Sequence, residues 1–293
     1  MEPDFLSLLL GTVLLRPYVF IFMAAYLIAS TLQFGVKRTV SFMVIGYWLV
    51  FLAEYSSTRT GFPFGWYYYI DTTRHQELWV SNVPFMDSLS FIFLAYASYL
   101  TALLLCAPLW RSRRDLQIVD TKALRRSPAV LGLAVMFFVL IDVVIDPVAL
   151  RGSRWFLGQI YGYYEEGMYF GVPLANFAGW AIVGVVLITL HRLLDGVFKD
   201  GPQQRADWGV RWVPYRGLFG PLLYLGTYGF NVCMTFVIGE YLLGLVDLFL
   251  LVPVSVLACT QVTRASNRAT QADLERHCED FPHTPLARFT SQT

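Results

Sequence analysis

The fold is decided by residues 141–180, which read IDVVIDPVALRGSRWFLGQIYGYYEEGMYFGVPLANFAGW. An apolar helix carrying Asp142 and Asp146 is expected to break at Pro147, because proline has no backbone N–H to donate. An aromatic, glycine-rich loop follows, and a second apolar segment begins close to Asn176. Carboxyl and amide groups at membrane depth are costly unless they have a partner or a function. We therefore expect a functional site in this stretch.

A second stretch, residues 54–87, follows the same plan. Glu54 stands near the end of an apolar segment, and an aromatic, glycine-rich loop occupies residues 61–69. Asp87 stands near the start of the next apolar segment. We expect the two stretches to meet in the folded chain, so that their polar side chains share one site.

Composition places the chain among polytopic membrane proteins. Of its 293 residues, 56% are hydrophobic and 15% are charged, whereas a soluble domain averages about 25% charged residues. The net charge of +1 gives no long-range field that favours nucleic acid, so no nucleic-acid partner is expected. The four cysteines form no CxxC pair, which disfavours a zinc or redox site built from cysteine.

Hydropathy predicts an all-α bundle of about seven membrane-spanning helices, because each apolar segment is close to the ~20 residues that cross the hydrocarbon of a bilayer. The expected spans are 17–35, 39–56, 83–109, 128–147, 172–194, 213–238 and 240–261. A short interfacial helix is expected at residues 5–15. Residues 1–263 form the expected membrane domain, and residues 264–293 a polar, disordered cytoplasmic tail.

Lysine and arginine are concentrated in alternate loops. The loops after spans one, three and five, together with the tail, contain Lys37, Arg38, Arg111, Arg113, Arg114, Lys122, Arg125, Arg126, Arg192, Lys199, Arg205, Arg211, Arg264, Arg268, Arg276 and Arg288. The positive-inside rule assigns these segments to the cytoplasm and the protein to the cytoplasmic membrane. Both aromatic loops, and the polar residues beside them, are then expected on the outer side.

Two other kinds of site are disfavoured. A retinal protein needs a lysine in its last span, but all three lysines lie in loops. A metal site in the tail would use His277, Cys278 and His283. Disorder is the preferred interpretation of that polar segment.

Asp142 and Asp146 are four residues apart and therefore share one helix face. Two like charges would repel there, so in a low-dielectric site we expect one of the two to be protonated. A neutral carboxyl group is a proton donor, as general-acid chemistry requires. The alternatives are that Asp142 bonds a neighbouring helix and that Asp146 lies in an interfacial Asp-Pro turn.

The other polar candidates also have structural alternatives. Glu54 could pair with Arg59 at the interface. Asp87 could simply occupy a helix N-terminus, where the dipole favours an anion, and Asn176 could satisfy a backbone group. Polar contacts between helices are expected from Glu240 and Asp247.

Aromatic side chains in and near the two loops have two interpretations. Tryptophan and tyrosine collect at membrane interfaces in any case. Aromatic rings could also line a groove for a long polyene and stabilise a cation with their faces. The substrate-binding candidates are Phe64, Trp66, Tyr67, Trp155, Tyr169 and Trp180.

A set of short motifs occurs in a fixed order along the chain. They are Arg16-Pro17-Tyr18-Val19-Phe20, Glu54, Gly61-Phe62-Pro63-Phe64-Gly65-Trp66-Tyr67, Val83-Pro84-Phe85-Met86-Asp87, Asp146-Pro147, and Gly171-Val172-Pro173-Leu174-Ala175-Asn176-Phe177-Ala178-Gly179-Trp180. Together they resemble the membrane-bound carotenoid 1,2-hydratase family, which includes bisanhydrobacterioruberin hydratases, over residues 16–260. The resemblance implies water addition across the terminal double bond of γ-carotene, lycopene or a fifty-carbon carotenoid. A tertiary 1-hydroxy product, no cofactor and no metal are implied as well, and no catalytic residue is carried over.

The residues fit this chemistry without help from the resemblance. Protonating an isolated trisubstituted alkene requires a strong acid, a wall that tolerates a cation, and a water molecule with a base. We expect Asp142 or Asp146 to donate the proton. Glu54 or Asp87 would accept a proton from the water, and Asn176 would bond that water.

Two rival functions use the same features. A carotenoid cyclase would share the cation chemistry but exclude water. A non-catalytic carotenoid carrier or transporter is disfavoured, because transporters tend to contain internal repeats and broken helices, and no repeat is evident in this sequence.

Overall fold

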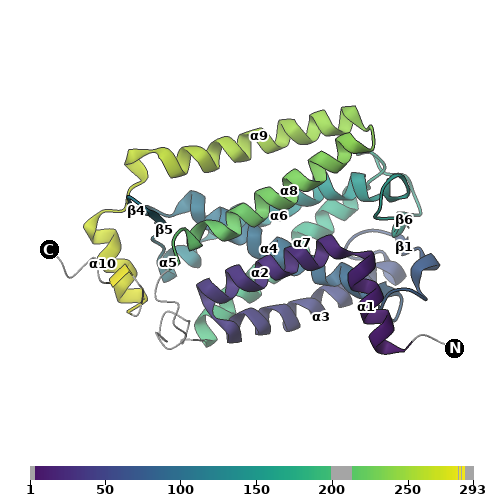
Figure 1. Ribbon diagram of the computed structural model, residues 1–293, viewed down its shortest axis with the longest axis horizontal. Coiled ribbons are helices and arrows are strands. Elements are labelled where there is room, and N and C mark those ends of the chain that lie inside the picture. Colours follow the sequence, from purple (N-terminus) through teal and green to yellow (C-terminus); the bar gives the residue numbers. More distant parts are fainter. Residues whose placement is uncertain (1–3, 199–212, 283, 285, 288–293) are drawn as a thin grey trace.

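The computed structural model describes residues 4–198, 213–282, 284 and 286–287. The expected all-α bundle is confirmed, with short two-stranded sheets at its ends (Figure 1). The helices are α1 (Phe5–Leu15), α2 (Pro17–Phe34), α3 (Val36–Thr60), α4 (Phe85–Cys106), α5 (Lys122–Arg125), α6 (Pro128–Ala149), α7 (Leu174–Val197), α8 (Phe219–Val237), α9 (Tyr241–Thr263) and α10 (Gln271–Asp280). The strands are β1 (Tyr67–Tyr69), β2 (Trp79–Val80), β3 (Val83–Pro84), β4 (Leu109–Ser112), β5 (Asp115–Ile118) and β6 (Tyr161–Tyr163). Short 3₁₀ turns are η1 (Asp71–Thr73), η2 (Gly152–Arg154), η4 (Arg216–Leu218) and η5 (Ala265–Asn267).

Helix α4 is the centre of the bundle. Nearly every side chain from Met86 to Leu104 is buried, as expected for a helix that is apolar on all faces. Helices α2, α3, α6, α7, α8 and α9 all pack against it. Helix α9 lies at the edge and exposes large apolar side chains such as Phe249, as a lipid-facing helix does. Because α4 is central, its first turn brings Asp87 into the interior of the bundle.

Seven long helices occupy the positions of the seven expected spans. Six of the described helices, α2, α3, α4, α6, α7 and α9, are long and apolar enough to cross a membrane. Helix α8 has 19 residues but is more polar, because it contains tyrosines, threonines and Asn231. It packs against α2, α4, α6 and α9 and stands at the expected sixth span.

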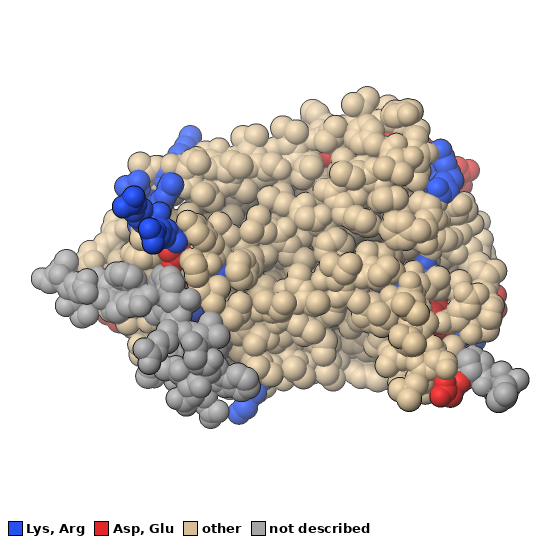
Figure 2. Space-filling model, in the orientation of Figure 1, with Lys and Arg blue, Asp and Glu red and all other residues tan. Residues whose placement is uncertain are grey.

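The two ends of the bundle differ in charge. The α2–α3 turn, the α4–α6 connection and the C-terminal segment lie at one end, whereas α1, β1, β6 and the α8–α9 turn lie at the other (Figure 1). Figure 2 shows lysine and arginine gathered near β4 and β5 at the first end. Four basic residues of the sequence expectation, Lys199, Arg205, Arg211 and Arg288, lie outside the described residues.

Strands β1 and β6 join the two aromatic loops. They pair antiparallel, with Tyr67 opposite Tyr163 and Tyr69 opposite Tyr161. Successive side chains of a strand point to opposite faces. All four of these tyrosines therefore share one face, while Tyr68 lies on the other, where it is 41% exposed. The two stretches with the same plan meet, as the sequence predicts.

Helix α6 does not break at Pro147, contrary to the sequence expectation. The helix continues to Ala149, and the N–H of Leu150 closes the last turn on the carbonyl of Asp146 at 2.9 Å. Proline so close to a helix end removes few backbone hydrogen bonds. The carbonyl of Pro147 accepts a hydrogen bond from Arg151 Nη1 at 2.7 Å instead.

The expectation of a disordered tail is wrong for residues 271–280, which form α10. The helix begins with a reciprocal capping box between Thr270 and Asp273. Leu274 is buried in a small cluster against the β5–α5 segment. His277 Nδ1 donates to the Asp120 carbonyl at 2.6 Å, and burial lowers the pKa of this imidazole. Local capping and one buried apolar contact order this segment, and His283 lies outside the described residues.

Candidate active site

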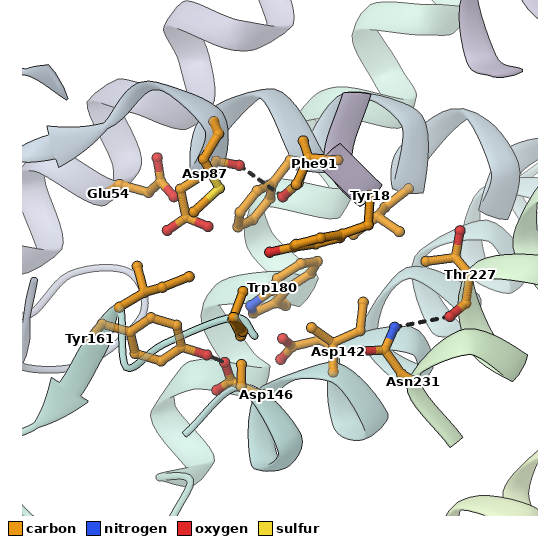
Figure 3. A pocket seen from close by; sticks show the side chains of 18 of the residues that line it. Tyr18, Glu54, Asp87, Phe91, Asp142, Asp146, Tyr161, Trp180, Thr227 and Asn231 are labelled. Carbon is orange, nitrogen blue, oxygen red and sulfur yellow. Dashed lines mark hydrogen bonds between the residues drawn. The ribbon is translucent and has the colours of Figure 1, made fainter. Parts of the chain in front are cut away.

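A cavity lies between α2, α3, α4, α6, α7 and α8, and the tyrosines of β1 and β6 line it as well. Its polar lining includes all five residues expected to act in catalysis, namely Glu54, Asp87, Asp142, Asp146 and Asn176. Figure 3 shows the four acids around one space, with Glu54 and Asp87 on one side and Asp142 and Asp146 on the other. Antiparallel helices explain this convergence, because the last turns of α3 and α6 adjoin the first turns of α4 and α7.

Glu54 and Asp87 form the first acidic pair. Glu54 is 2% exposed, and its two oxygens accept from the hydroxyls of Tyr69, at 3.1 Å, and Ser88. The Tyr69 hydroxyl also lies 2.6 Å from Asp87 Oδ2, and the two acid side chains hydrogen-bond to each other. Two carboxylates offer no donor between them. The pair therefore holds a shared proton.

Asp142 and Asp146 form the second acidic pair, and one amide links them. Asn176 Nδ2 lies 2.8 Å from Asp142 Oδ2 and 2.9 Å from Asp146 Oδ2, so its two N–H groups serve both acids. Asp146 also accepts from the hydroxyls of Tyr161 and Tyr163, the latter at 2.6 Å. Asp142 Oδ1 is buried and has no hydrogen-bond partner among the described residues. Three donors favour a charged Asp146, whereas an unpartnered buried oxygen favours a neutral Asp142.

The tyrosines of β1 and β6 are the hydrogen-bond donors of the site. Burial, reinforced by the neighbouring carboxyl groups, raises the pKa of Tyr69, Tyr161 and Tyr163 well above the usual range. These hydroxyls therefore keep their protons at physiological pH. Each one can hold a carboxyl group in place without exchanging its own proton.

Aromatic rings form the walls between the acidic pairs. Trp180 stacks on Phe91 with ring centroids 4.2 Å apart, and Phe138 packs against the same indole at 4.7 Å. Of the predicted substrate-binding residues, Phe64, Tyr67, Trp155 and Trp180 line the cavity. Aromatic ring faces can stabilise a cation that lies within about 6 Å of the ring centroid.

Trp66 and Tyr169 do not line the cavity, contrary to expectation. Trp66 precedes β1 and lies on the face opposite Tyr67, where it is 54% exposed. Tyr169 packs against Phe170 and Phe177 outside the site, with ring centroids 5.0 and 5.7 Å apart. Side chains alternate between the two faces of each loop, and this alternation decides on which side Trp66 and Tyr169 lie. The sequence does not show which residues face the cavity.

Several lining residues were not among the sequence candidates. They are contributed by α2, α4 and α8 and include Tyr18, Phe22, Phe93, Thr227, Phe230 and Asn231. The motif at residues 16–20 was a signal for Tyr18. The spacing of Thr227 and Asn231, four residues apart on an otherwise apolar helix, was a signal for a polar inner face.

The structure shows whether Glu54, Asp247 and Glu240 make the structural contacts that the sequence suggested for them. Arg59 does not reach Glu54, since its guanidinium lies 3.4 Å from the Tyr55 ring centroid. Asp247 makes the expected helix–helix contact, accepting from Thr235 Oγ1 of α8 at 3.1 Å. Glu240 pairs with Arg151 and Arg154, in the loop after α6, instead of with a helix.

Comparison with known protein families identifies the family of the chain. The model of the family described as carotenoid biosynthesis protein matches residues 8–262. The chain belongs to this family. The family description assigns the chain a role in carotenoid biosynthesis.

One relative has a more specific name. The chain is 28% identical over 205 residues to a bisanhydrobacterioruberin hydratase of Haloarcula japonica, an alignment that covers 62% of this chain and 62% of the relative. The alignment thus spans less than two thirds of that protein. No solved structure matches the chain.

Proposed function

We propose that this protein is a carotenoid hydratase. It adds water across the terminal 1,2 double bond of an acyclic carotenoid end group and gives a tertiary 1-hydroxy carotenoid. The observation that supports this most is the convergence of two acidic pairs on one aromatic cavity. Lycopene, γ-carotene and fifty-carbon carotenoids carry the required end group, and the hydratase name of the relative adds support.

Asp142 is the proton donor in this proposal. Its Oδ1 has no partner among the described residues, and its Oδ2 is held by Asn176. A protonated carboxyl group whose free oxygen has no competing partner can direct its proton to an alkene, whereas a proton shared with a second base is held in that hydrogen bond. Asp146, with three donors, stays ionised and is a poor base.

Asp87 is the base that receives a proton from water. It stands in the first turn of α4, where the helix dipole stabilises a carboxylate. Glu54, held by Ser88, supplies the proton that the pair shares. Asp87 and Asp142 line the same cavity from opposite sides, so acid and base face the same space (Figure 3).

The chemical steps balance without any further reactant. The Asp142 proton forms a new C–H bond at C2 with the π electrons of the double bond, which leaves a tertiary cation at C1. A water oxygen forms the C–O bond to C1 and transfers one proton to Asp87. Proton return from Asp87 to Asp142 completes the cycle, so the mechanism uses only side chains and water.

The aromatic wall stabilises the cation between these two steps. The face of Trp180, fixed by Phe91 and Phe138, lines the cavity between the acidic pairs. Its apolar surroundings also limit the number of water molecules near the cation. We further propose that the bundle resides in the cytoplasmic membrane, with the basic end inside.

Product mass tests the proposed reaction. The gene is expressed in hosts that accumulate lycopene or γ-carotene, and the extracted carotenoids are separated by chromatography and weighed by mass spectrometry. We expect each modified end group to gain the mass of one water molecule. A product isomeric with the substrate would indicate a cyclase, and unchanged pigment in every host would overturn the proposal.

A further inference from the structure

The cavity is too short for a whole carotenoid. Along α4 its lining runs from Met86 to Leu94, which is about 12 Å at 1.5 Å per residue. A carotenoid is comparable in length to the hydrocarbon core of a bilayer, about 30 Å. If the end group lies between the acidic pairs, most of the polyene must leave the cavity.

The β1–β6 pair lines one end of the cavity with its tyrosines, and Arg16 fixes the neighbouring loops. Arg16 forms a buried ion pair with Glu77 at 3.0 Å and donates to the carbonyl of Leu157. The fully buried helix α4 and the acidic pairs close other sides.

The seam between α2 and α8 is different, because aromatic rings there connect the cavity to the surface. Tyr18 and Phe230 stack with centroids 5.8 Å apart and planes inclined by 17°, and Phe22 contacts Phe230 at 5.8 Å. All three line the cavity and are only half-buried. Phe156, which packs on Tyr18 at 5.8 Å, is 55% exposed. This cluster contains no charged side chain.

Helix α8 also leaves open space beside this seam. Gly226 is one turn before Phe230 and Gly229 directly precedes it, and a Cβ added at either glycine would meet no atom within 4 Å. In Figure 3, Tyr18 points into the cavity from α2, opposite Thr227 and Asn231 of α8. The seam is thus aromatic, and it lies beside open space on the surface of α8.

We propose that the α2–α8 seam, formed by Tyr18, Phe22 and Phe230, is the binding subsite for the polyene chain. This inference rests on the proposed function for the position of the end group. The conjugated chain lies against the ring faces of the seam and continues along α8 in the lipid. Flat aromatic faces suit a planar polyene, because offset stacking adds to the area that is buried. Arg16 acts at a distance by fixing the loops that surround Tyr18.

Binding without turnover tests this subsite. The probe is lycopene, titrated by its absorption spectrum into detergent-solubilised Asp142→Asn protein, in which the proposed mechanism makes hydration too slow to interfere. Phe230→Trp narrows the seam from α8, and Phe22→Trp narrows it independently from α2. Each is expected to weaken lycopene binding by about tenfold, the order of effect of crowding an apolar pocket. Phe249→Trp, on the exposed face of α9, is the matched control and should bind like its parent.

A short ligand distinguishes an effect on the seam from an effect on the end-group site between the acidic pairs. An acyclic monoterpene with the same end group but no polyene fits within the cavity, so its dissociation constant, measured by competition with lycopene in the same Asp142→Asn background, should not change in Phe230→Trp or Phe22→Trp. Equal lycopene affinity in both seam variants and the control would overturn the subsite. An equal loss for the short ligand would also overturn it, because the effect would then lie at the end-group site. A protein that binds lycopene through the seam but never forms a hydrated product would instead contradict the proposed function.

Discussion

The α3–α4 half and the α6–α7 half of the site are built on one plan and differ at one residue type. In each half, 15 residues separate an acid from the tyrosine that bonds it, Glu54 from Tyr69 and Asp146 from Tyr161. In each, a Val-Pro pair precedes the next helix. The residue that follows in the first turn is Asp87 in one half and Asn176 in the other.

This difference separates the chemical roles of the two halves. Asn176 brings two N–H donors and no charge, so it bridges Asp142 and Asp146 and leaves one Asp142 oxygen without a partner. Asp87 brings a second charge and no donor, so Glu54 must share a proton with it. In our proposal, the amide half supplies the acid and the all-acid half supplies the base.

The largest expected effect comes from the acid. Asp142→Asn keeps the shape of the side chain but cannot protonate an alkene, and we expect hydration to fall by about a thousandfold, within the range of general-acid catalysis. Chromatography of carotenoids at equal protein levels measures it. Asp71→Asn, at an exposed position, is the control. Full activity in Asp142→Asn together with loss of activity in Asp146→Asn would show that Asp146, and not Asp142, is the proton donor.

Asp87→Asn makes the first half resemble the second. It removes the base and leaves Glu54 without its anionic partner, and we expect about a hundredfold loss of kcat. Substrate binding should change little, since the end group is apolar. Loss in Glu54→Gln together with normal turnover in Asp87→Asn would identify Glu54 as the base instead.

Tyr69→Phe removes the hydroxyl that both acids of the first half contact. Hydrogen bonds to charged groups contribute about 1.5–3 kcal/mol, so we expect a loss of roughly tenfold in kcat/KM. Tyr68→Phe, one residue away on the other face of β1, should have no effect. Equal losses in the two variants would show that the strand, and not the hydroxyl, matters.

The smallest expected effect is on stability at alkaline pH. Because the pKa of Tyr69 and of Tyr161 is raised in the folded state, the unfolded chain loses these protons first, from about pH 10. The contribution of these tyrosines is therefore complete below pH 10 and is lost as the pH rises further. Thermal unfolding between about pH 8 and 11 should show this decline, and Tyr69→Phe and Tyr161→Phe should each reduce its slope. A decline that begins well below pH 10 would contradict the burial of these hydroxyls.

The sequence was sufficient for the helices and for the meeting of the two stretches. Apolar segments of sufficient length predict spans, and acids such as Glu54 and Asp142 at membrane depth predict a shared polar site. The predicted helix break at Pro147 and the predicted disorder of residues 271–280 were wrong. The effect of a proline near a helix end, or of a capping box, depends on the groups that pack around it. Both were settled by contacts of Arg151 and Leu274 with other segments.

Details that depend on register and packing could not be predicted. The strand register decides that Tyr67 faces the cavity while Trp66 faces outward. The bridge from Asn176 to both acids depends on how α6 and α7 pack. Phe230 could not be recognised, because an apolar residue that faces a cavity and one that faces lipid look alike in a membrane helix.

The most direct test of the central claim, acid-catalysed water addition at this cavity, is isotope incorporation. Purified protein is incubated with lycopene in water labelled with both deuterium and oxygen-18, and the product is analysed by mass spectrometry. We predict one oxygen-18 at the tertiary carbon and one deuterium at the adjacent carbon of each hydrated end, with neither label incorporated by Asp142→Asn. A hydroxylated product without the solvent oxygen, or labelling by Asp142→Asn at the rate of the unaltered protein, would contradict it.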